Sequence, residues 1–409
     1  MKKLNIAAVL LCAAITVYPQ GTVQEESLVV NIEIPVRVFD GDRFVDDLKI
    51  GDFEIYENGI PQKVDAVYLI NKRTIERSEE KKKFLPETTR DFYLYFEITE
   101  YLPRLGEALE YFIENVFFPG DHLTVVTPLK TYRLKDKTFE HLSKKEVIDQ
   151  LQRILKKDAM IGSAEYRSTV RDLTGLAKAA TANLSEEYDV SQKQDQFDVG
   201  NYLQMPLNVQ LSMYANLLKK LDGLRSVDQN QLMSFAESMK KKPGQKYVFL
   251  FYQREFIPEI EPRILNQYLT MHQEQPDVVH TISNLFDFYT RHITFNVDLI
   301  KKAYSDSSIS MHFLFVTRPP EVVSGIRFDE HSEDIYAAFK EMALATGGYT
   351  DSSSNPNYLF RKAIEMSENY YLLYYAPENF VRDGQFKDVE VRIKRSRYRI
   401  SHRLGYFAN

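Results

Sequence analysis

Two short polar tracts, each directly after a run of apolar residues, carry the side chains whose types could do chemistry. They contain Glu97, Thr99, Glu100 and Tyr101 after residues 92–96, and Arg254 and Glu255 after residues 247–252. Two carboxylates such as Glu97 and Glu100 can act as acid and base in glycoside hydrolysis, although acids three positions apart on one loop are common by chance. Arginine and aromatic side chains at a loop rim are typical anchors of protein interfaces. We therefore interpret the tracts either as a partner-binding rim or as solvated strand ends.

No complete catalytic signature accompanies these tracts in the sequence. The eight histidines are scattered and form no His-Glu-x-x-His, and neither Gly-x-Gly-x-x-Gly nor a phosphate-loop pattern occurs. The single cysteine, Cys12, lies in the N-terminal apolar segment, which excludes thiol catalysis, zinc fingers, iron–sulfur clusters and a disulfide scaffold from the mature chain. We therefore expect no cofactor, no catalytic residue and no enzyme activity.

The length and composition indicate a globular protein of two or three domains. The chain has 409 residues, of which 44% are hydrophobic, enough for a sizeable core. Lys plus Arg number 52 against 58 Asp plus Glu, so the formal net charge is −6. A nucleic-acid binder normally has a basic face, so we expect another protein as the partner and no nucleic acid.

The N-terminus predicts export. Lys2 and Lys3 precede an apolar run at residues 6–17, as in a secretory signal, and we place the signal peptide at residues 1–20. The run is shorter than the roughly 20 apolar residues that a spanning helix needs. No later stretch is apolar enough to cross a membrane, so the mature chain is expected to lack a transmembrane segment. We expect the protein in the periplasm or outside the cell, with an uncleaved N-terminal anchor as the open alternative.

Strand patterns appear at both ends of the chain. Apolar and polar residues alternate strictly over residues 30–38 and again over 389–393, which predicts half-buried strands. Asn58-Gly59 is a strong hairpin signal, because both residues tolerate positive φ. Two or three strands alone are marginally stable. We therefore predict one antiparallel β unit built from residues 28–70 and 385–409, with the middle of the chain inserted into it.

The middle of the chain predicts an α/β domain. A polar linker at residues 71–90 precedes residues 91–377, where continuous apolar runs alternate with helical patterns. Such runs are typical of parallel strands covered on both faces, and the alternation is typical of a doubly wound sheet. Residues 158–244 are long and helical, so we predict a helical insertion there.

Six short motifs stand in a defined order along the chain. They are Asp52-Phe53-Glu54-Ile55-Tyr56-Glu57-Asn58-Gly59-Ile60-Pro61-Gln62, Phe118-Pro119-Gly120-Asp121, Leu344-Ala345-Thr346-Gly347-Gly348, Tyr371-Leu372-Leu373-Tyr374-Tyr375-Ala376-Pro377, Asp383-Gly384-Gln385-Phe386-Lys387 and Arg403-Leu404-Gly405-Tyr406. Together they resemble the exported bacterial proteins with a von Willebrand factor A-related domain, a family well known from acidobacteria. The resemblance covers nearly the whole mature chain. It implies a Rossmann-like A domain with a flanking β region, and a role in adhesion or complex assembly.

The same resemblance implies where a metal-ion-dependent adhesion site would lie. A domains use Asp-x-Ser-x-Ser after the first strand, a Thr from a second loop and an Asp after the fourth strand. Here Glu97 stands at the first Asp, Tyr101 replaces the second Ser, and no Asp follows the later strand, where Arg254 would add positive charge. Mg²⁺ demands about six oxygens near 2.1 Å in tight octahedral geometry. We therefore expect a degenerate site that binds no metal.

These observations predict an exported, noncatalytic protein-interaction or adhesion module of the von Willebrand A type that works without metal. The predicted partner-binding residues are Glu97, Thr99, Glu100, Tyr101, Arg254 and Glu255. The candidates for the second-loop hydroxyl are Ser163, Ser168 and Thr169. Two alternatives stay open: a metal-dependent adhesion protein with a rearranged Mg²⁺ or Mn²⁺ site, and an envelope hydrolase.

Overall fold

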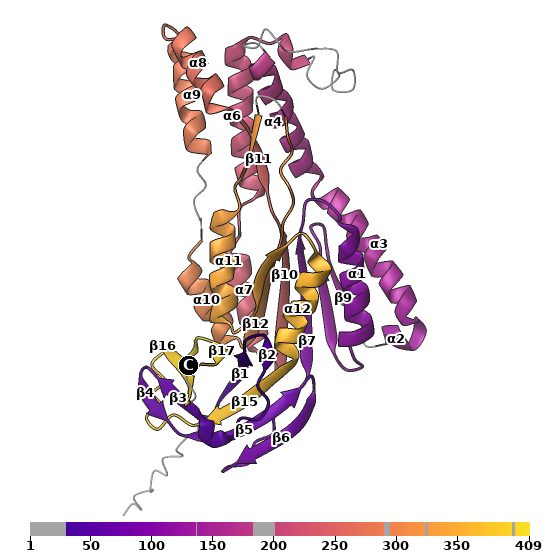
Figure 1. The fold of residues 1–409 in the computed structure, drawn as a ribbon, viewed down its shortest axis with the longest axis vertical. Helices are drawn as coiled ribbons and strands as arrows, with labels where there is room; N and C mark the ends of the chain where they lie inside the picture. The colour runs from indigo at the N-terminus through magenta and orange to yellow at the C-terminus, as the bar shows by residue number, and fades with distance from the viewer. Residues whose placement is uncertain (1–29, 136, 183–200, 290–294, 324–325, 395–396) are drawn as a thin grey trace, which may run out of the picture.

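The protein has three parts arranged along its long axis (Figure 1). A β unit lies at one end, an α/β sheet covered by helices lies in the middle, and further helices extend from the far end. The computed structural model describes residues 30–409 except 136, 183–200, 290–294, 324–325 and 395–396. The predicted signal peptide at residues 1–20 lies outside the described residues. Within the described chain, every helix is too short or too polar to cross a membrane.

The central sheet has five parallel strands and one antiparallel edge strand. In pairing order they are β14 (Thr350–Ser353), β12 (Ile309–Val316), β10 (Gln245–Gln253), β7 (Arg90–Glu97), β8 (His122–Val126) and the antiparallel β9 (Thr131–Leu134). The interior strands β7, β10 and β12 are the continuous apolar runs, because helices bury both of their faces. The predicted parallel α/β sheet is therefore present.

Helices cover both faces of this sheet. One face packs against α1 (Pro103–Tyr111), η2 (Phe112–Val116), α3 (Lys144–Gly162) and α12 (Pro356–Glu368), with α2 (Thr138–His141) at its margin. The other face packs against α7 (Gln229–Lys240), α10 (Val297–Asp306) and α11 (Glu333–Ala345). Side chains alternate along each strand, so Leu94 and Phe96 face the first layer while Tyr93 faces the second.

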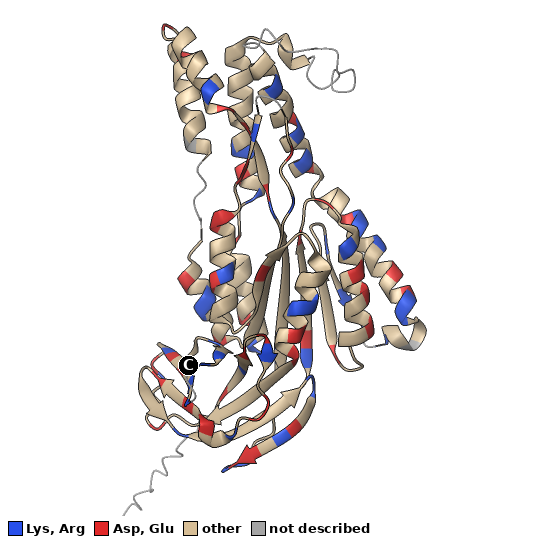
Figure 2. Cartoon of the chain, in the orientation of Figure 1, with Lys and Arg blue, Asp and Glu red and all other residues tan. Residues whose placement is uncertain are grey.

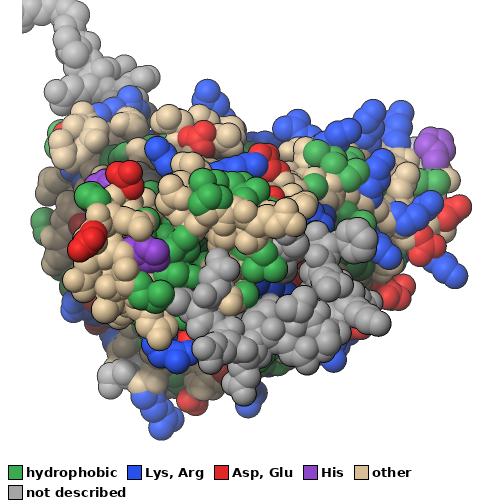
Figure 3. Space-filling view, turned by 90° about the horizontal axis from the view of Figure 1, so that it is seen from above, with side chains coloured by type: hydrophobic (Ala, Val, Ile, Leu, Met, Phe, Trp, Pro, Cys, Tyr) green, Lys and Arg blue, Asp and Glu red, His purple; other side chains and the backbone are tan. Residues whose placement is uncertain are grey.

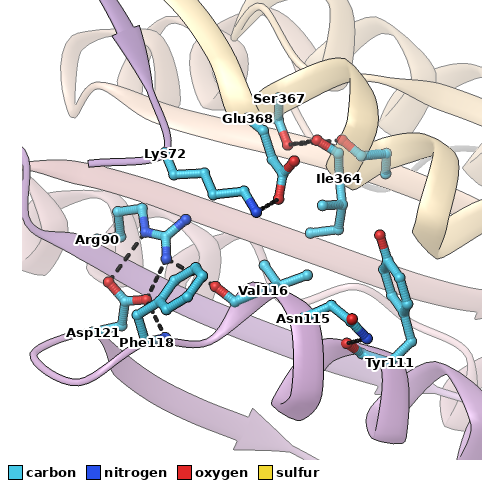
Figure 4. A network of polar contacts seen from close by, with 11 residues as sticks. Lys72, Arg90, Tyr111, Asn115, Val116, Phe118, Asp121, Ile364, Ser367 and Glu368 are labelled. Atoms are coloured by element: carbon cyan, nitrogen blue, oxygen red, sulfur yellow. Dashed lines mark hydrogen bonds and ion pairs between the residues drawn. The ribbon is translucent and has the colours of Figure 1, made fainter. Parts of the chain in front are cut away.

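The turn before β8 is built around the buried carboxylate of Asp121 (Figure 4). Arg90 donates from Nε to Asp121 Oδ1 at 3.1 Å and from Nη2 to the Val116 carbonyl at 2.8 Å. The same Nη2 also donates to Asp121 Oδ2. The Phe118 backbone N–H donates to Asp121 Oδ2 at 2.9 Å. The motif at residues 118–121 thus joins the start of β7 to the end of η2.

The two ends of the chain form the β unit. Its larger sheet contains β17 (Arg399–His402), β1 (Ile32–Asp40), β15 (Asn369–Tyr375), β5 (Val64–Asn71) and β6 (Thr74–Glu80), with β2 (Arg43–Phe44) beside β1. Its smaller sheet contains β18 (Gly405–Phe407), β16 (Phe386–Ile393), β3 (Phe53–Glu57) and β4 (Ile60–Gln62), and η1 (Ile50–Asp52) precedes β3. Both sheets contribute to one apolar core. The expected pairing of N-terminal with C-terminal strands is therefore present.

Arg403 joins the β unit to the α/β part, and a close backbone contact holds the end of α11 within the α/β part. The buried Arg403 guanidinium donates to the Glu33 carbonyl and to Ser308 Oγ, both at 2.7 Å. Beyond α11, a Cβ on Gly348 would lie 1.7 Å from the Met311 carbonyl oxygen, so only glycine fits there. The close approach at Gly348 therefore seats the end of α11 against β12.

Above the carboxyl ends of the parallel strands stands a group of elements that we call the tower. It contains α4 (Ala164–Ala182), α6 (Leu207–Leu224), α8 (Pro262–Met271), α9 (Pro276–Phe288), and the antiparallel pair β11 (Phe256–Ile260) and β13 (Ile326–Glu330). These elements share a separate apolar core. The tower is therefore built from three stretches of chain, one before β10, one between β10 and β12, and one after β12.

Three of the sequence-based boundaries are corrected by this arrangement. Residues 71–90 are not only a linker, because β6 pairs there with β5; its polar composition reflects its exposed position at a sheet edge. Residues 370–375, predicted in the α/β domain, form β15 at the centre of the β unit, where apolar clusters cover both faces. The insertion predicted at 158–244 is too short, because the tower also takes residues 256–288 and 326–330.

We predict that Asp121→Ala lowers the free energy of unfolding by about 3–5 kcal/mol, because it leaves the Arg90 guanidinium buried without a counter-charge. Urea unfolding measures the change. Glu110→Ala, on the exposed side of α1, is the matched control and should change stability by less than about 0.5 kcal/mol. Equal effects of the two substitutions would contradict the role assigned to Asp121.

Candidate functional site

A cavity of about 610 Å³ lies beneath the tower, where β7, β8 and β10 end. It is bordered by the end of β7, the segment 126–128 after β8, the junction of α3 with α4, and α7. In open parallel sheets, ligands bind outside the carboxyl ends of the strands, where neighbouring connections leave in opposite directions. β7 and β10 are such a pair, because the chain continues from β7 to β8 on one side and from β10 to β12 on the other. The cavity therefore occupies the position that this kind of sheet offers to a ligand.

The inner wall of the cavity is largely aromatic and aliphatic. Because side chains alternate along a strand, those of β7 and β10 that point toward α7 line the cavity together with the facing helices. They include Tyr95, Leu250, Tyr252, Phe235, Tyr304 and Phe339. The cavity thus has an apolar body and a polar mouth at the strand ends.

The amide of Gln253, the last residue of β10, holds the loop that follows β7. Its Oε1 accepts from the Thr99 backbone N–H at 2.9 Å, from Thr99 Oγ1 at 3.1 Å and from the Glu100 backbone N–H at 3.1 Å. Its Nε2 donates to Glu100 Oε1 at 3.2 Å. Gln253 is 1% exposed, so these hydrogen bonds are shielded from water. One neutral side chain therefore joins the ends of two neighbouring strands.

The carbonyl of Thr99 is held from the opposite side. Ser163 Oγ, at the junction of α3 and α4, donates to it at 2.7 Å, and Arg167 Nη1 donates to it at 2.9 Å. Ser163 is one of the three candidates for a second-loop hydroxyl, and the structure brings it to the loop. Thr169 is buried and donates within α4 to the Glu165 carbonyl. The loop after β7 is thus tied to β10 and to the base of the tower.

The six predicted site residues do not all line the cavity. Glu97, Thr99 and Glu255 line the cavity, whereas Glu100, Tyr101 and Arg254 lie outside its lining. Tyr101 packs against the core on the other face of the sheet. Arg254 pairs with Glu330 of β13 at 3.0 Å and stacks near Phe315, and Glu100 pairs with Arg318 at 3.4 Å. The cavity therefore includes three of the six predicted residues, and partner binding by the set stays a prediction.

The residues at the loop do not fit a Mg²⁺ ion. Gln253 and Thr99 already use their oxygens in hydrogen bonds, and the Arg167 guanidinium brings positive charge to the Thr99 carbonyl. In the described part of the chain, no group of three or more His, Cys, Asp or Glu residues could hold a metal. A divalent ion would have to displace several hydrogen bonds and approach a cation.

Two carboxylates at the mouth of the cavity have different surroundings. Glu255 pairs with Arg225 and accepts from the Tyr252 hydroxyl at 3.0 Å. Solvent reaches Glu97 through the cavity, yet desolvation by the surrounding protein, helped by the nearby Glu255 charge, raises the pKa of the Glu97 carboxyl. No described residue makes a hydrogen bond or ion pair to that carboxyl. Glu97 is thus a solvent-accessible acid to which the described residues supply no counter-charge.

Two of the residues that shape this site were not among the predicted site residues. Gln253 could have been found, because it occupies the strand end where the resemblance demands an Asp. Arg225 carried no signal, since it reaches Glu255 from the segment that links α6 to α7.

Comparisons with known proteins give no assignment. No protein-family profile and no curated protein matches the chain. Among solved structures, the human COPII-coat protein Sec24c is similar, with a TM-score of 0.29 and 7% sequence identity over 79% of this chain. The match spans 44% of that protein's length. Similarity at this level supports no statement about fold or function.

We predict that Gln253→Leu lowers the free energy of unfolding by about 1–3 kcal/mol, because the Thr99 and Glu100 N–H groups lose their acceptor. Hydrogen exchange at these two amides should accelerate beyond the general destabilisation. Gln267→Leu on the exposed side of α8 is the control and should change neither stability nor this exchange. Unchanged protection of both amides in Gln253→Leu would refute the proposed tie.

Proposed function

We propose that this chain is a noncatalytic protein-interaction module of the von Willebrand factor A-related type, acting without metal in the periplasm or outside the cell. Numbered along the chain, the strands of the central sheet have the order 3-2-1-4-5-6, which supports a Rossmann-like doubly wound domain. The six motifs and the export signal in the sequence support the family and the location.

The observation that carries the metal-independent part of the proposal is the Gln253 tie. In a metal-dependent adhesion site, an ion links the loop after the first strand to the end of the fourth. Here the Gln253 amide makes that link directly, with Oε1 at 2.9 to 3.1 Å from its three donors. The loop therefore has its binding-competent shape as soon as the chain folds.

The surface around the tower supports a protein as the partner. Seen from the tower end, hydrophobic side chains gather in several groups between Lys and Arg (Figure 3). Exposed apolar residues on the tower include Met271 on α8 and Phe288 on α9. Charges of both signs are mixed along the helices (Figure 2), unlike the one-signed basic face of a nucleic-acid binder. Mixed apolar and charged surface is typical of protein interfaces.

The two alternatives have less support. The metal-dependent alternative would place a divalent ion beside Arg167 and break the bonds of Gln253. The hydrolase alternative places its site in the predicted helical insertion and stays a prediction; a carboxylate pair of Glu97 and Glu100 is a separate glycosidase interpretation. Glu100 lies outside the cavity and is engaged by Arg318 and Gln253, so the two acids do not face a common substrate position.

We predict that a partner captured from the native cell envelope is retained equally with and without EDTA. Millimolar Mg²⁺ or Mn²⁺ should leave the melting temperature unchanged, because a bound ion at about 100 times its Kd would add about 2.7 kcal/mol. Glu97→Ala is the control. A metal-induced rise in melting temperature that Glu97→Ala abolishes would replace this proposal by the metal-dependent one.

A further inference from the structure

We propose that the cavity under the tower binds an organic ammonium ion, with the charged nitrogen at the Glu97 carboxylate and an apolar body among the aromatic side chains of the inner wall. This inference goes beyond the proposed interaction with a protein and does not require it. The ammonium group is the shared chemistry of two sources, a free arylalkyl or alkyl amine and a lysine side chain of another protein.

The charges lining the cavity favour a cation. The charged lining residues are Glu97, Arg225, Asp228 and Glu255, three acids against one base. Arg225 pairs with Glu255, and Asp228 accepts from two backbone N–H groups at the start of α7. Glu97 is then the acid for which the described residues provide no partner. A positively charged ligand would supply the missing counter-charge of Glu97, whereas an anion would be repelled by it.

The shape and lining of the cavity favour an apolar body behind the charge. A volume of about 610 Å³ lies in the range of small-molecule sites, which are mostly apolar with a few placed polar groups. Tyr95, Tyr252 and Phe235 border the space next to Glu97. Aromatic faces attract ammonium groups, and the attraction strengthens where water is excluded.

The raised pKa of Glu97 agrees with this assignment. Crowding by protein and the Glu255 charge disfavour the ionised carboxyl in the free protein. An ammonium group at the same place would offset both effects. A bound ammonium group would therefore lower the pKa of the Glu97 carboxyl relative to the free protein.

The test is calorimetric titration of the full chain with phenethylamine, and with 2-phenylethanol and 3-phenylpropionate as neutral and anionic analogues. We expect phenethylamine to bind at least about tenfold more tightly than either analogue, a difference of about 1.4 kcal/mol. Nα-acetyllysine methylamide is the second amine; preference for it assigns the site to a protein lysine, and preference for phenethylamine assigns it to a free amine. Equal binding of phenethylamine and 2-phenylethanol, or binding of neither amine, overturns the proposal.

Two variants test separately the contribution of the ligand's ammonium charge and that of its apolar body. Glu97→Gln keeps the side-chain shape and breaks no hydrogen bond made by the described residues, so it should fold and lose at least about tenfold in amine affinity. Glu100→Gln, on the same loop but outside the cavity, is the matched control and should bind amines as before. Phe235→Leu should weaken the amine and the alcohol together.

Unchanged amine binding by Glu97→Gln also overturns the proposal. Because partner capture is measured without added amine, a failure of this inference leaves the proposed protein interaction standing, and the reverse holds as well.

Discussion

The arrangement of the site depends on one neutral side chain, Gln253. Its amide oxygen satisfies two backbone N–H groups and a hydroxyl at the end of the neighbouring strand, and it is shielded from water. Buried amide groups that lose their partners are costly, so the loop after β7 has little freedom to change shape. An ion held in the same place would make the loop geometry depend on ion concentration. With Gln253, that geometry is a property of the fold itself.

The fixed loop also explains why no described residue pairs with the Glu97 carboxyl. The Gln253 tie directs Glu100 toward Arg318, and Ser163 with Arg167 holds the Thr99 carbonyl under the tower. Glu97 precedes this loop on the cavity side of β7, where the nearest guanidinium of the lining, Arg225, already pairs with Glu255. Among the described residues, Glu97 is therefore left without compensation, because Arg225 is engaged by Glu255.

Local patterns in the sequence predicted local structure well. The apolar run at residues 92–96 forms the parallel strand β7, and Asn58-Gly59 turns with φ values of 49° and 79°. The turn joins β3 to the short strand β4. The polar edge strand β6 was missed, and residues 370–375 were assigned to the α/β domain instead of the β unit. Composition indicates how much of a strand is buried, but it does not indicate which strands pair with it. The site was predicted only in part. The sequence located the strand ends, but the directions of the Tyr101 and Arg254 side chains depend on contacts with residues that are distant in the sequence.

The interleaved ends of the chain have a consequence for how the molecule is made. β1 pairs on one side with β15 and on the other with β17, and β3 pairs with β16, so β1 and β3 pair with segments that are synthesised much later. Until then, β1 and β3 present open hydrogen-bonding edges, which favour association with other chains. A prematurely terminated chain would keep the edges of β1 and β3 unpaired. These open edges would mark it for cellular proteases and chaperones. The strand edges of the β unit are therefore paired only after β15, β16 and β17 have been synthesised.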